Sequence, residues 1–409
     1  MTTLASIPSP ADNVWDIHLG SFHLPLHIYG LMIALGVLAA IWLSRKRWAA
    51  WGHDPDLVID LAYWGVPGGL IGARLYHVIT DYNRLYVDNF WGIFKIWDGG
   101  LGIPGGILGG VLAGYICARR HKAPVPDLLD MVAPALPLAQ AIGRFGNYFN
   151  QELYGRPTTL PWGLQIDPAH RPPDLIGVTT FHPTFAYEAL WNLGLMGVLL
   201  GIDRYRGTGR DLPRVAVWCA YGLFALGGGL DVLLVAQRQT ELGTAAQIGL
   251  FIVGAVAVAA LFGWASGLNQ RGLRRRADLF VTYVAGYFLG RLWVESLRID
   301  TANTIVGLRL NEWVAIIVVL GALAALKWRG RSDELRPIDV GSGSIAPPDT
   351  DDVGAAAGSP DAEGDSAPSD AGDDAPGPNE VDQARATNDL VSSSGADEVA
   401  EADVAQPES

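Results

Sequence analysis

The stretch from Gly143 to Arg156 reads GRFGNYFNQELYGR and places a dense group of polar side chains at the end of a long apolar segment. A guanidinium at membrane depth costs about 2.5 kcal/mol or more, so Arg144 is expected to face the protein interior and to have a function there. Arginine stays ionised, and its planar fork matches phosphate oxygens bidentately. Gly143 and Gly146 would let a neighbouring backbone or a ligand approach closely. This stretch therefore predicts a site for an anionic group inside a membrane.

The composition of the chain is that of a membrane protein. Half of its 409 residues are hydrophobic, and its 50 glycines and 14 tryptophans are typical of closely packed transmembrane helices with aromatic anchors at the interfaces. The chain has 2 cysteines, Cys117 and Cys219, each within an apolar segment, so we expect packing roles and no disulfide framework or metal site. The first apolar run is followed by SRKRW and has no cleavage site, so we expect it to remain as a helix.

Nine apolar segments are long enough to span about 30 Å of hydrocarbon at about 1.5 Å per residue. We therefore predict an all-α polytopic membrane protein whose transmembrane domain covers 26–331, after an external N-terminal segment at 1–25. The predicted spans are 26–43, 57–79, 100–118, 128–149, 184–202, 214–236, 245–266, 278–298 and 309–328.

Charge patterning sets the predicted orientation. Basic clusters follow every odd-numbered span, and the positive-inside rule places those ends in the cytoplasm and the N-terminus outside. A Pro-rich polar stretch at 150–183 is then external and is predicted to form a small cap. Residues 332–409 carry 20 Asp and Glu against 2 Arg and no aromatic residue, which predicts a disordered acidic cytoplasmic tail. The remaining basic residues lie in short clusters between apolar segments and give no support for nucleic-acid binding.

The stretch 143–156 also resembles the signature of the prolipoprotein diacylglyceryl transferases, bacterial enzymes that attach lipid to prolipoprotein signal peptides. Further segments agree with that family in order and spacing: LHIYG at 26–30, WDGG at 97–100, HPTFAYE at 182–188 and GYFLGRLWVE at 286–295. The resemblance implies a multi-pass enzyme of the bacterial inner membrane. It would transfer the diacylglyceryl group of phosphatidylglycerol to the lipobox cysteine of prolipoprotein signal peptides and release glycerol 1-phosphate, without a cofactor or metal.

Such a reaction requires a compensated phosphate charge, an ionised thiol and the exclusion of water. Arg144 and Arg291 are the expected phosphate ligands, because each lies in the outward half of an apolar segment. Tyr287, Arg291 and Glu295 recur every fourth residue and therefore share one helix face. The alternative is that each arginine only pairs with a buried carboxylate, Glu152 or Glu295, and holds helices together.

Several other residues are expected at the same site. The resemblance implies a functional Tyr29, whereas His27 is either a participant or an interfacial hydrogen-bonding residue. Asn147 and Asn150 are expected to bind phosphate or glycerol oxygens or to cap their helix. Gly155 is expected in a tight turn, and Arg74 is expected to close the anionic pocket. The expected catalytic residues are Tyr29, Tyr287, Arg291 and Glu295, and the expected substrate-binding residues are His27, Arg74, Arg144, Asn147, Asn150 and Gly155.

Two features depart from the family pattern. The family has seven spans, so the pair at 214–266 is extra, and we expect it at the periphery because it carries no motif and few polar residues at mid-span. Many members have a His at the position of Pro104, and proline cannot act as a base. The thiol is then deprotonated by Glu295, His27 or His182, or is ionised by the positive potential of the arginines.

Two other functions remain open. A non-enzymatic anionic-lipid-binding protein or carrier would also explain intramembrane arginines and Gly-rich helices, but it would not explain the ordered motifs. A phosphatidyl transferase needs clustered Asp ligands for a divalent metal, and Asp98 stands alone in the apolar region.

Overall fold

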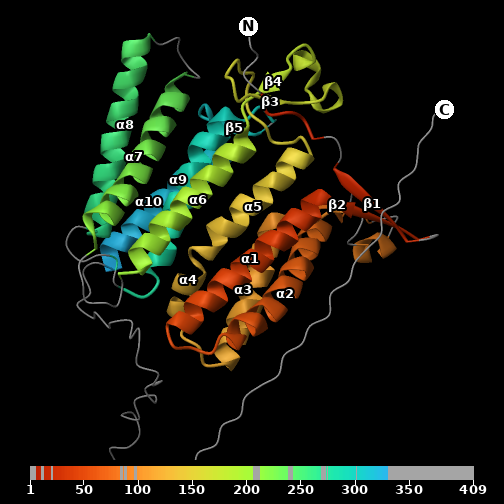
Figure 1. Cartoon of the computed structure of the whole chain (residues 1–409), viewed down its shortest axis with the longest axis vertical. Coiled ribbons are helices and arrows are strands. Elements are labelled where there is room, and N and C mark those ends of the chain that lie inside the picture. Colours follow the sequence, from red (N-terminus) through yellow and green to blue (C-terminus); the bar gives the residue numbers. More distant parts are fainter. Residues whose placement is uncertain are drawn as a thin grey trace, which may run out of the picture. The chain divides into compact units, whose positions relative to one another are not determined.

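The computed structural model describes residues 6–10, 13–19, 22–82, 86, 90–95, 99–205, 212–237, 243–268, 273, 275–300 and 302–329. Within these ranges the chain is mostly helical, and long helices run side by side in a bundle (Figure 1). Trp97 and Asp98 of the WDGG segment lie outside the described residues, as does the predicted tail at 332–409.

Each of the predicted apolar segments contains a helix. The helices are α1 (Ile28–Ala50), α2 (Asp56–Asp81), α3 (Ile103–Arg120), α4 (Val125–Val132), α5 (Ala135–Phe149), α6 (Thr184–Asp203), α7 (Arg214–Gln237), α8 (Thr244–Ser266), α9 (Asp278–Leu297) and α10 (Leu310–Arg329). The segment predicted at 128–149 is broken, since α4 and α5 meet at an angle of 42°. Pro134 lies at this break, where its missing N–H ends one helix and starts the next.

Five described helices are long and apolar enough to cross a membrane: α1, α6, α7, α8 and α10, with the bent pair α4–α5 as a possible sixth span. The chain is thus a polytopic helical membrane protein. The other three predicted spans correspond to α2, α3 and α9. Helix α2 carries Arg74, α3 is rich in glycine, and α9 carries Arg291 and Glu295. These polar and small residues lower the mean hydropathy of α2, α3 and α9.

Helices α2 and α3 pack backbone to backbone along a seam of glycines. A Cβ on Gly72 would lie 2.9 Å from the Cα of Gly109, so neither position accepts a side chain without separating the helices. The amide of Gly102 donates to the Ala73 carbonyl at 2.9 Å. This contact fixes the start of α3 beside the last turns of α2, where Arg74 lies.

The predicted extra pair consists of α7 and α8, which pack against each other. Helix α7 also contacts α6 and α9, and a Cβ on its Gly227 would lie 2.8 Å from the ring of Trp191. Asp231 of α7 is buried at 6% exposure and is one of the few polar residues within this pair. Helix α7 therefore packs against both α6 and α9.

Short strands lie outside the helices. They form three antiparallel pairs: β1 (Val14–Leu19) with β2 (Phe22–His27), β3 (Leu164–Gln165) with β4 (Thr180–Phe181), and β5 (Thr304–Ile305) with β6 (Leu308–Arg309). The segment between α5 and α6 contains β3 and β4 and encloses a small apolar core of its own, made of Tyr154, Leu164, Ile166, Phe181 and Phe185. Ile7 pairs with Leu164, which ties the N-terminal region to this unit.

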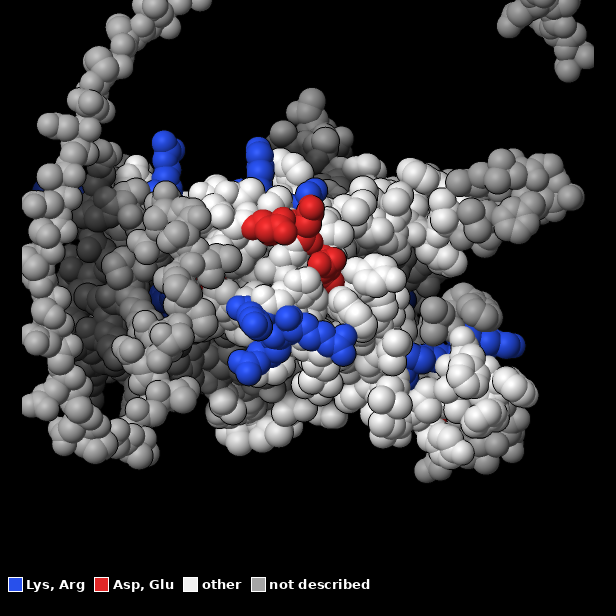
Figure 2. Space-filling view, turned by 90° about the horizontal axis from the view of Figure 1, so that it is seen from below, with Lys and Arg blue, Asp and Glu red and all other residues white. Residues whose placement is uncertain are grey.

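The other end of the bundle is basic. Figure 2, seen from below relative to Figure 1, shows Lys and Arg side chains gathered on this face beside a few acidic ones. Exposed basic residues at the helix ends there are Lys46, Arg119, Arg120, Lys122 and Arg204. Arg47 is the buried exception, because it pairs with Asp203 at 2.9 Å and donates to backbone carbonyls at the end of α4.

Candidate active site

Two arginines from different helices converge on one carboxylate. Oε2 of Glu188 in α6 lies 2.6 Å from Nη2 of Arg144 in α5, and Oε1 lies 3.4 Å from Nη1 of Arg291 in α9. The Glu188 side chain is 7% exposed, whereas those of Arg144 and Arg291 are 19% and 18% exposed. A buried counter-ion therefore holds the two guanidinium groups together while each keeps an accessible side. The alternative interpretation of the sequence paired each arginine with Glu152 or Glu295. The observed carboxylate partner of Arg144 is Glu188, whereas Arg291 contacts both Glu188 and Glu295.

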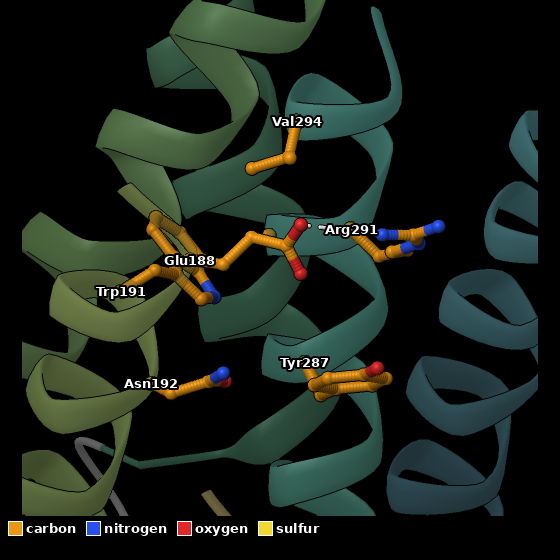
Figure 3. A pocket seen from close by; sticks show the side chains of 7 residues that line it. Glu188, Trp191, Asn192, Tyr287, Arg291 and Val294 are labelled. Atoms are coloured by element: carbon orange, nitrogen blue, oxygen red, sulfur yellow. Dashed lines mark hydrogen bonds and ion pairs between the residues drawn. The ribbon is translucent and has the colours of Figure 1, made fainter. Parts of the chain in front are cut away.

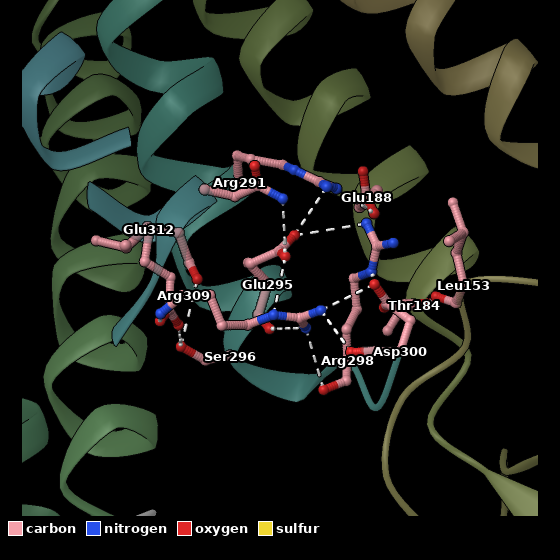
Figure 4. Close-up of polar contacts among 12 residues, drawn as sticks. Leu153, Thr184, Glu188, Arg291, Glu295, Ser296, Arg298, Asp300, Arg309 and Glu312 are labelled. Carbon is pink, nitrogen blue, oxygen red and sulfur yellow. Dashed lines mark hydrogen bonds and ion pairs between the residues drawn. The ribbon is translucent and has the colours of Figure 1, made fainter. Parts of the chain in front are cut away.

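Glu295 is fully buried and accepts from several cationic and amide groups (Figure 4). Nη2 of Arg291 lies 2.8 Å from Oε2, and Nη1 of Arg298 lies 3.5 Å from the same oxygen. Nε of Arg309 and Nδ2 of Asn311 lie 3.2 Å and 3.1 Å from Oε1. The geometry fits a Glu295 that orients Arg291.

A further layer fixes Arg309. Its Nη2 lies 2.8 Å from the Asp300 carboxylate, and its backbone amide donates to Glu312 at 2.7 Å. The other Glu312 oxygen accepts from the Ser296 hydroxyl at 2.8 Å. These contacts join the end of α9 to the start of α10. They give the buried Arg309 two carboxylate partners, Glu295 and Asp300, and they give the buried Glu312 two hydrogen-bond donors.

Tyr287 and Arg291 lie on the predicted common face of α9 and line a small cavity facing α6 (Figure 3). The cavity has room for about one water molecule and is completed by Glu188, Trp191 and Asn192. The indole N–H of Trp191 donates to the Gly286 carbonyl at 2.9 Å. Glu188, the carboxylate that contacts both arginines, therefore forms part of the cavity wall.

The end of α5 brings together the polar residues of the 143–156 stretch. Nδ2 of Asn147 donates to Glu152 at 2.8 Å, and its Oδ1 lies 3.4 Å from Arg144. Asn150 is the C-cap residue of α5 and lies 3.5 Å from Glu152. The predicted asparagines thus form a hydrogen-bonded chain that leads to Arg144.

Tyr29 is part of the same neighbourhood. Its ring covers Gly146, where a Cβ would lie 2.6 Å from Cδ2 of the tyrosine, and it is close enough to Arg144 and Glu152 to interact electrostatically. Gly146 has the predicted role of admitting a close neighbour. Gly143 does not, because an added Cβ there would meet nothing within 4 Å. His27 is exposed at the end of β2.

Gly155 is required by close packing. Its backbone is not in the left-handed region, and a Cβ would lie 2.8 Å from the Cβ of His182 and 3.2 Å from the Leu297 carbonyl oxygen. The expectation of a tight turn was wrong, because Gly155 instead pairs in extended form with Arg298. Its amide donates to the His182 carbonyl at 3.0 Å, and the Arg156 amide donates to Leu297 at 2.9 Å. This segment thus clamps the end of α9 to the start of α6.

His182 and Pro183 join β4 to α6, and Pro183 is the N-cap residue of α6. The ring of His182 lies 3.2 Å from the Tyr187 hydroxyl. Burial, with the Arg156 guanidinium nearby, holds the pKa of His182 below its ordinary value. The imidazole is therefore neutral at neutral pH.

Left-handed residues turn the chain from α5 into the segment that follows. Gln151 and Leu153 have φ values of 51° and 57°, which non-glycine residues adopt only where surrounding contacts hold them. The Gln151 amide makes two hydrogen bonds with Asp167, at 2.6 Å to its carboxylate and 2.7 Å from its backbone N–H. Hydrogen bonds from Gln151 and Ser9 hold the pKa of Asp167 below its usual range. The signature stretch is thereby fixed to the unit that contains β3 and β4.

Arg74 holds a loop. Its guanidinium donates to carbonyls of Ile93, Gly99 and Gly100 at 2.8, 2.6 and 3.0 Å, and it also contacts Gly92 and Lys95. Gly99 and Gly100 have φ values of 85° and 72°, a conformation that turns their carbonyls toward the arginine and favours glycine. All five donors of a guanidinium are matched by this set. The observed role of Arg74 is therefore to bind the backbone at 92–95 and 99–100, and among the described residues the pocket role expected from the sequence has no contact to support it.

Glu188 is the residue that sequence reasoning missed. It is the last letter of the HPTFAYE motif, and it is a carboxylate within an apolar segment, which by itself indicates a buried partner or a function. Of this motif, only His182 was considered for a role, as a candidate base, and the carboxylate of Glu188 was given none. Among the described residues, no group of three or more His, Cys, Asp or Glu side chains has the arrangement of a metal site.

Fold and site together define a polytopic membrane protein with arginines inside its helical bundle. Residues 17–229 and 235–328 match the prolipoprotein diacylglyceryl transferase family, and the chain belongs to this family. The matched ranges run through most of α7 and all of α8, so the expectation that the pair at 214–266 is extra to the family pattern was wrong.

Individual relatives agree with this assignment. The chain is 39% identical to phosphatidylglycerol–prolipoprotein diacylglyceryl transferase 2 of Streptomyces coelicolor, over 84% of this chain and 93% of the relative. It is 40% identical to the Frankia alni phosphatidylglycerol–prolipoprotein diacylglyceryl transferase, over 79% of this chain and 67% of the relative. The enzyme of the same name from Corynebacterium glutamicum ATCC 13032 is 36% identical, over 85% of this chain and 94% of the relative.

Proposed function

We propose that this protein transfers the diacylglyceryl group of phosphatidylglycerol to the lipobox cysteine of prolipoproteins, forming a thioether and releasing glycerol 1-phosphate. Membership of the family and the names of its relatives support this assignment. The observation in the site that carries it is the convergence of Arg144 and Arg291 on one carboxylate, because two guanidinium forks held close together match a phosphodiester.

The phosphate of the lipid would bind between Arg144 and Arg291 from the side on which both are partly exposed. Their charge would stabilise the phosphate as the bond between its ester oxygen and the glyceryl carbon breaks. Glu295 would hold Arg291 in position, and the Asn147–Glu152 contact would do the same for Arg144. Tyr29 and Tyr287, which border this region, are proposed to contact the lipid or the incoming peptide.

The proposed topology follows from charge. The basic face shown in Figure 2 would be cytoplasmic, which puts the Arg144–Arg291 pair toward the external side and the segment 150–183 over it as a cap. We propose nine spans, in which α2, α3 and α9 cross the membrane inside the bundle where neighbouring helices satisfy their polar residues. The N-terminal residues 1–25 would be external and the tail 332–409 cytoplasmic.

A direct assay tests the function. Purified protein in detergent or vesicles is mixed with phosphatidylglycerol and a signal-peptide fragment that contains the lipobox cysteine. We expect release of glycerol 1-phosphate and a mass gain on the peptide equal to one diacylglyceryl group. The same peptide with Ser in place of Cys is the matched control and should give neither product. Lipid binding without any release of glycerol 1-phosphate would contradict the proposal and favour a non-enzymatic lipid-binding protein.

A further inference from the structure

Asn192 carries a buried acceptor that lacks a donor. Its side chain is 2% exposed, and its Oδ1 has no hydrogen-bond partner among the described residues. A buried amide oxygen without a donor has lost the hydrogen bonds that it would make with water, and this is unfavourable. A side chain of this kind, retained at the edge of a site, indicates a donor that arrives in another state of the protein.

Asn192 lies beside Glu188. It lies four residues after Glu188 on α6, so both side chains project from one face of the helix, and both line the cavity shown in Figure 3. Trp191 lines the same cavity, but its only donor is already bonded to the Gly286 carbonyl. The Tyr287 hydroxyl and the Arg291 guanidinium also line this cavity. Glu188 is the carboxyl among its lining residues, and a protonated carboxyl is a donor that suits an amide oxygen.

The ion-pair partners of Glu188 are the two arginines that are proposed to bind the lipid phosphate. Its two oxygens contact Arg144 at 2.6 Å and Arg291 at 3.4 Å, the positions proposed for the phosphodiester. A lipid phosphate that takes these arginines leaves both Glu188 oxygens without their ion-pair partners. A buried carboxylate without a cationic partner is a far better proton acceptor.

The other carboxylates of the site have partners that the substrate does not displace. Glu295 keeps Arg298, Arg309 and Asn311 when Arg291 turns to a ligand. Glu152 accepts from Asn147 and Asn150. Of the carboxylates in the described site, Glu188 is thus the one whose charge compensation depends on the phosphate position being empty.

We propose that Glu188 is the proton acceptor of the transfer reaction, and that binding of the lipid phosphate to Arg144 and Arg291 releases it to act, with Asn192 holding the protonated carboxyl. This inference rests on the function proposed above. The S–H bond of the substrate cysteine breaks and its proton moves to a Glu188 oxygen. The thiolate sulfur bonds to the glyceryl carbon, and the carbon–oxygen bond to the phosphate breaks with its electron pair on the phosphate oxygen. The proton then leaves Glu188 with the released glycerol 1-phosphate or to water.

The test replaces the base and then supplies a substrate that does not need one. Glu188→Gln is compared with wild type on two peptides that differ only in cysteine or selenocysteine, since a selenol is already ionised at neutral pH. With the cysteine peptide at pH 7, Glu188→Gln should lose at least about 100-fold in rate and regain activity as the pH rises past the thiol pKa, near 8.5. With the selenocysteine peptide it should act within about tenfold of wild type.

Asn192→Leu provides the second variant, because it leaves both arginines and Glu188 in place if Glu188→Gln fails to fold. It should slow the cysteine reaction by about tenfold and shift its pH profile upward, and selenocysteine should abolish the difference from wild type. Phosphatidylglycerol binding, measured by native mass spectrometry, should be unchanged in Asn192→Leu and unchanged or tighter in Glu188→Gln. Glu295→Gln is the matched carboxylate control, and selenocysteine should not rescue it.

Two results would overturn the inference while the proposed function stands. One is an active wild type with a Glu188→Gln variant close to it at pH 7. The other is a loss in Glu188→Gln or Asn192→Leu that is equally large with selenocysteine. A wild type that releases no glycerol 1-phosphate would overturn the proposed function itself, and the inference with it.

Discussion

Oε2 of Glu188 lies 2.6 Å from Nη2 of Arg144, and this contact joins α6 to α5 at the centre of the candidate site. It ties the HPTFAYE motif to the signature stretch at 143–156. A buried ion pair of this kind is costly to break, at about 3–5 kcal/mol, because the remaining charge is left without compensation. The same contact holds the Arg144 guanidinium in a position where it can bind an anion.

Replacement of Arg144 should abolish transfer. Arg144→Ala removes the charge, and Arg144→Lys keeps a point charge but loses the fork that contacts Glu188 and Asn147 together. We expect a loss of about 10²–10³ in kcat for the lysine variant. Glycerol 1-phosphate release measures it, with Arg119→Lys at an exposed helix end as the control. Near-normal turnover in Arg144→Lys would refute the phosphate role.

Glu295→Gln should keep part of the activity. Its amide oxygen can still accept from Arg291 and Arg309, so Arg291 remains roughly oriented while the ionic part of the contact is lost. We expect a loss of about tenfold that stays constant between pH 6.5 and 9, because no proton acceptor has been removed. An inactive variant that recovers at high pH would instead make Glu295 the base.

Arg74→Lys should destabilise the protein more than it affects lipid affinity. An ammonium has three donors and cannot reach the carbonyls of Ile93, Gly99 and Gly100 that the guanidinium satisfies together. Each buried carbonyl left unpaired costs about 1–3 kcal/mol. Thermal unfolding in detergent measures the effect. An unchanged unfolding temperature would show that this contact is dispensable.

Acidification should weaken the junction of β4 and α6. Burial and Arg156 place the pKa of His182 in the folded protein below its unfolded value, which is near 6.5. The unfolded state therefore binds the proton more readily, and the stability contributed above the unfolded pKa is lost as the pH falls below about 6.5. Unfolding temperatures measured between pH 7.5 and 5.5 should fall less in His182→Gln than in wild type. Identical pH dependence in the two proteins would contradict this.

The acidic tail should be dispensable for catalysis. Its composition cannot form a packed core, and the proposed topology puts it across the membrane from the site. Protein truncated after Arg331 should keep its specific activity toward phosphatidylglycerol and the cysteine peptide. The circular dichroism spectrum and unfolding temperature of the truncated protein show whether it is folded. A large loss of activity in folded truncated protein would assign the tail a role in the reaction.

The sequence alone determined the helical segments and the chemistry of the chain. Apolar runs of span length must satisfy their backbone internally, so the spans predicted from hydropathy are helices, and the arginines within them pointed to an interior anion site. The i, i+4 spacing of Arg291 and Glu295 was enough to predict their contact, observed at 2.8 Å, because that spacing is fixed by the helix itself.

Only the tertiary structure decided which charges meet across helices. Glu188 joins Arg144 and Arg291 although the three are separated by tens of residues, and Arg74 faces a loop although it too is an arginine in an apolar helix. Gly155 is constrained by the neighbouring His182 and Leu297, which its own sequence context does not specify. Such pairings depend on how helices pack and rotate against each other, and hydrophobic periodicity sets a buried face without naming the partner that it will meet.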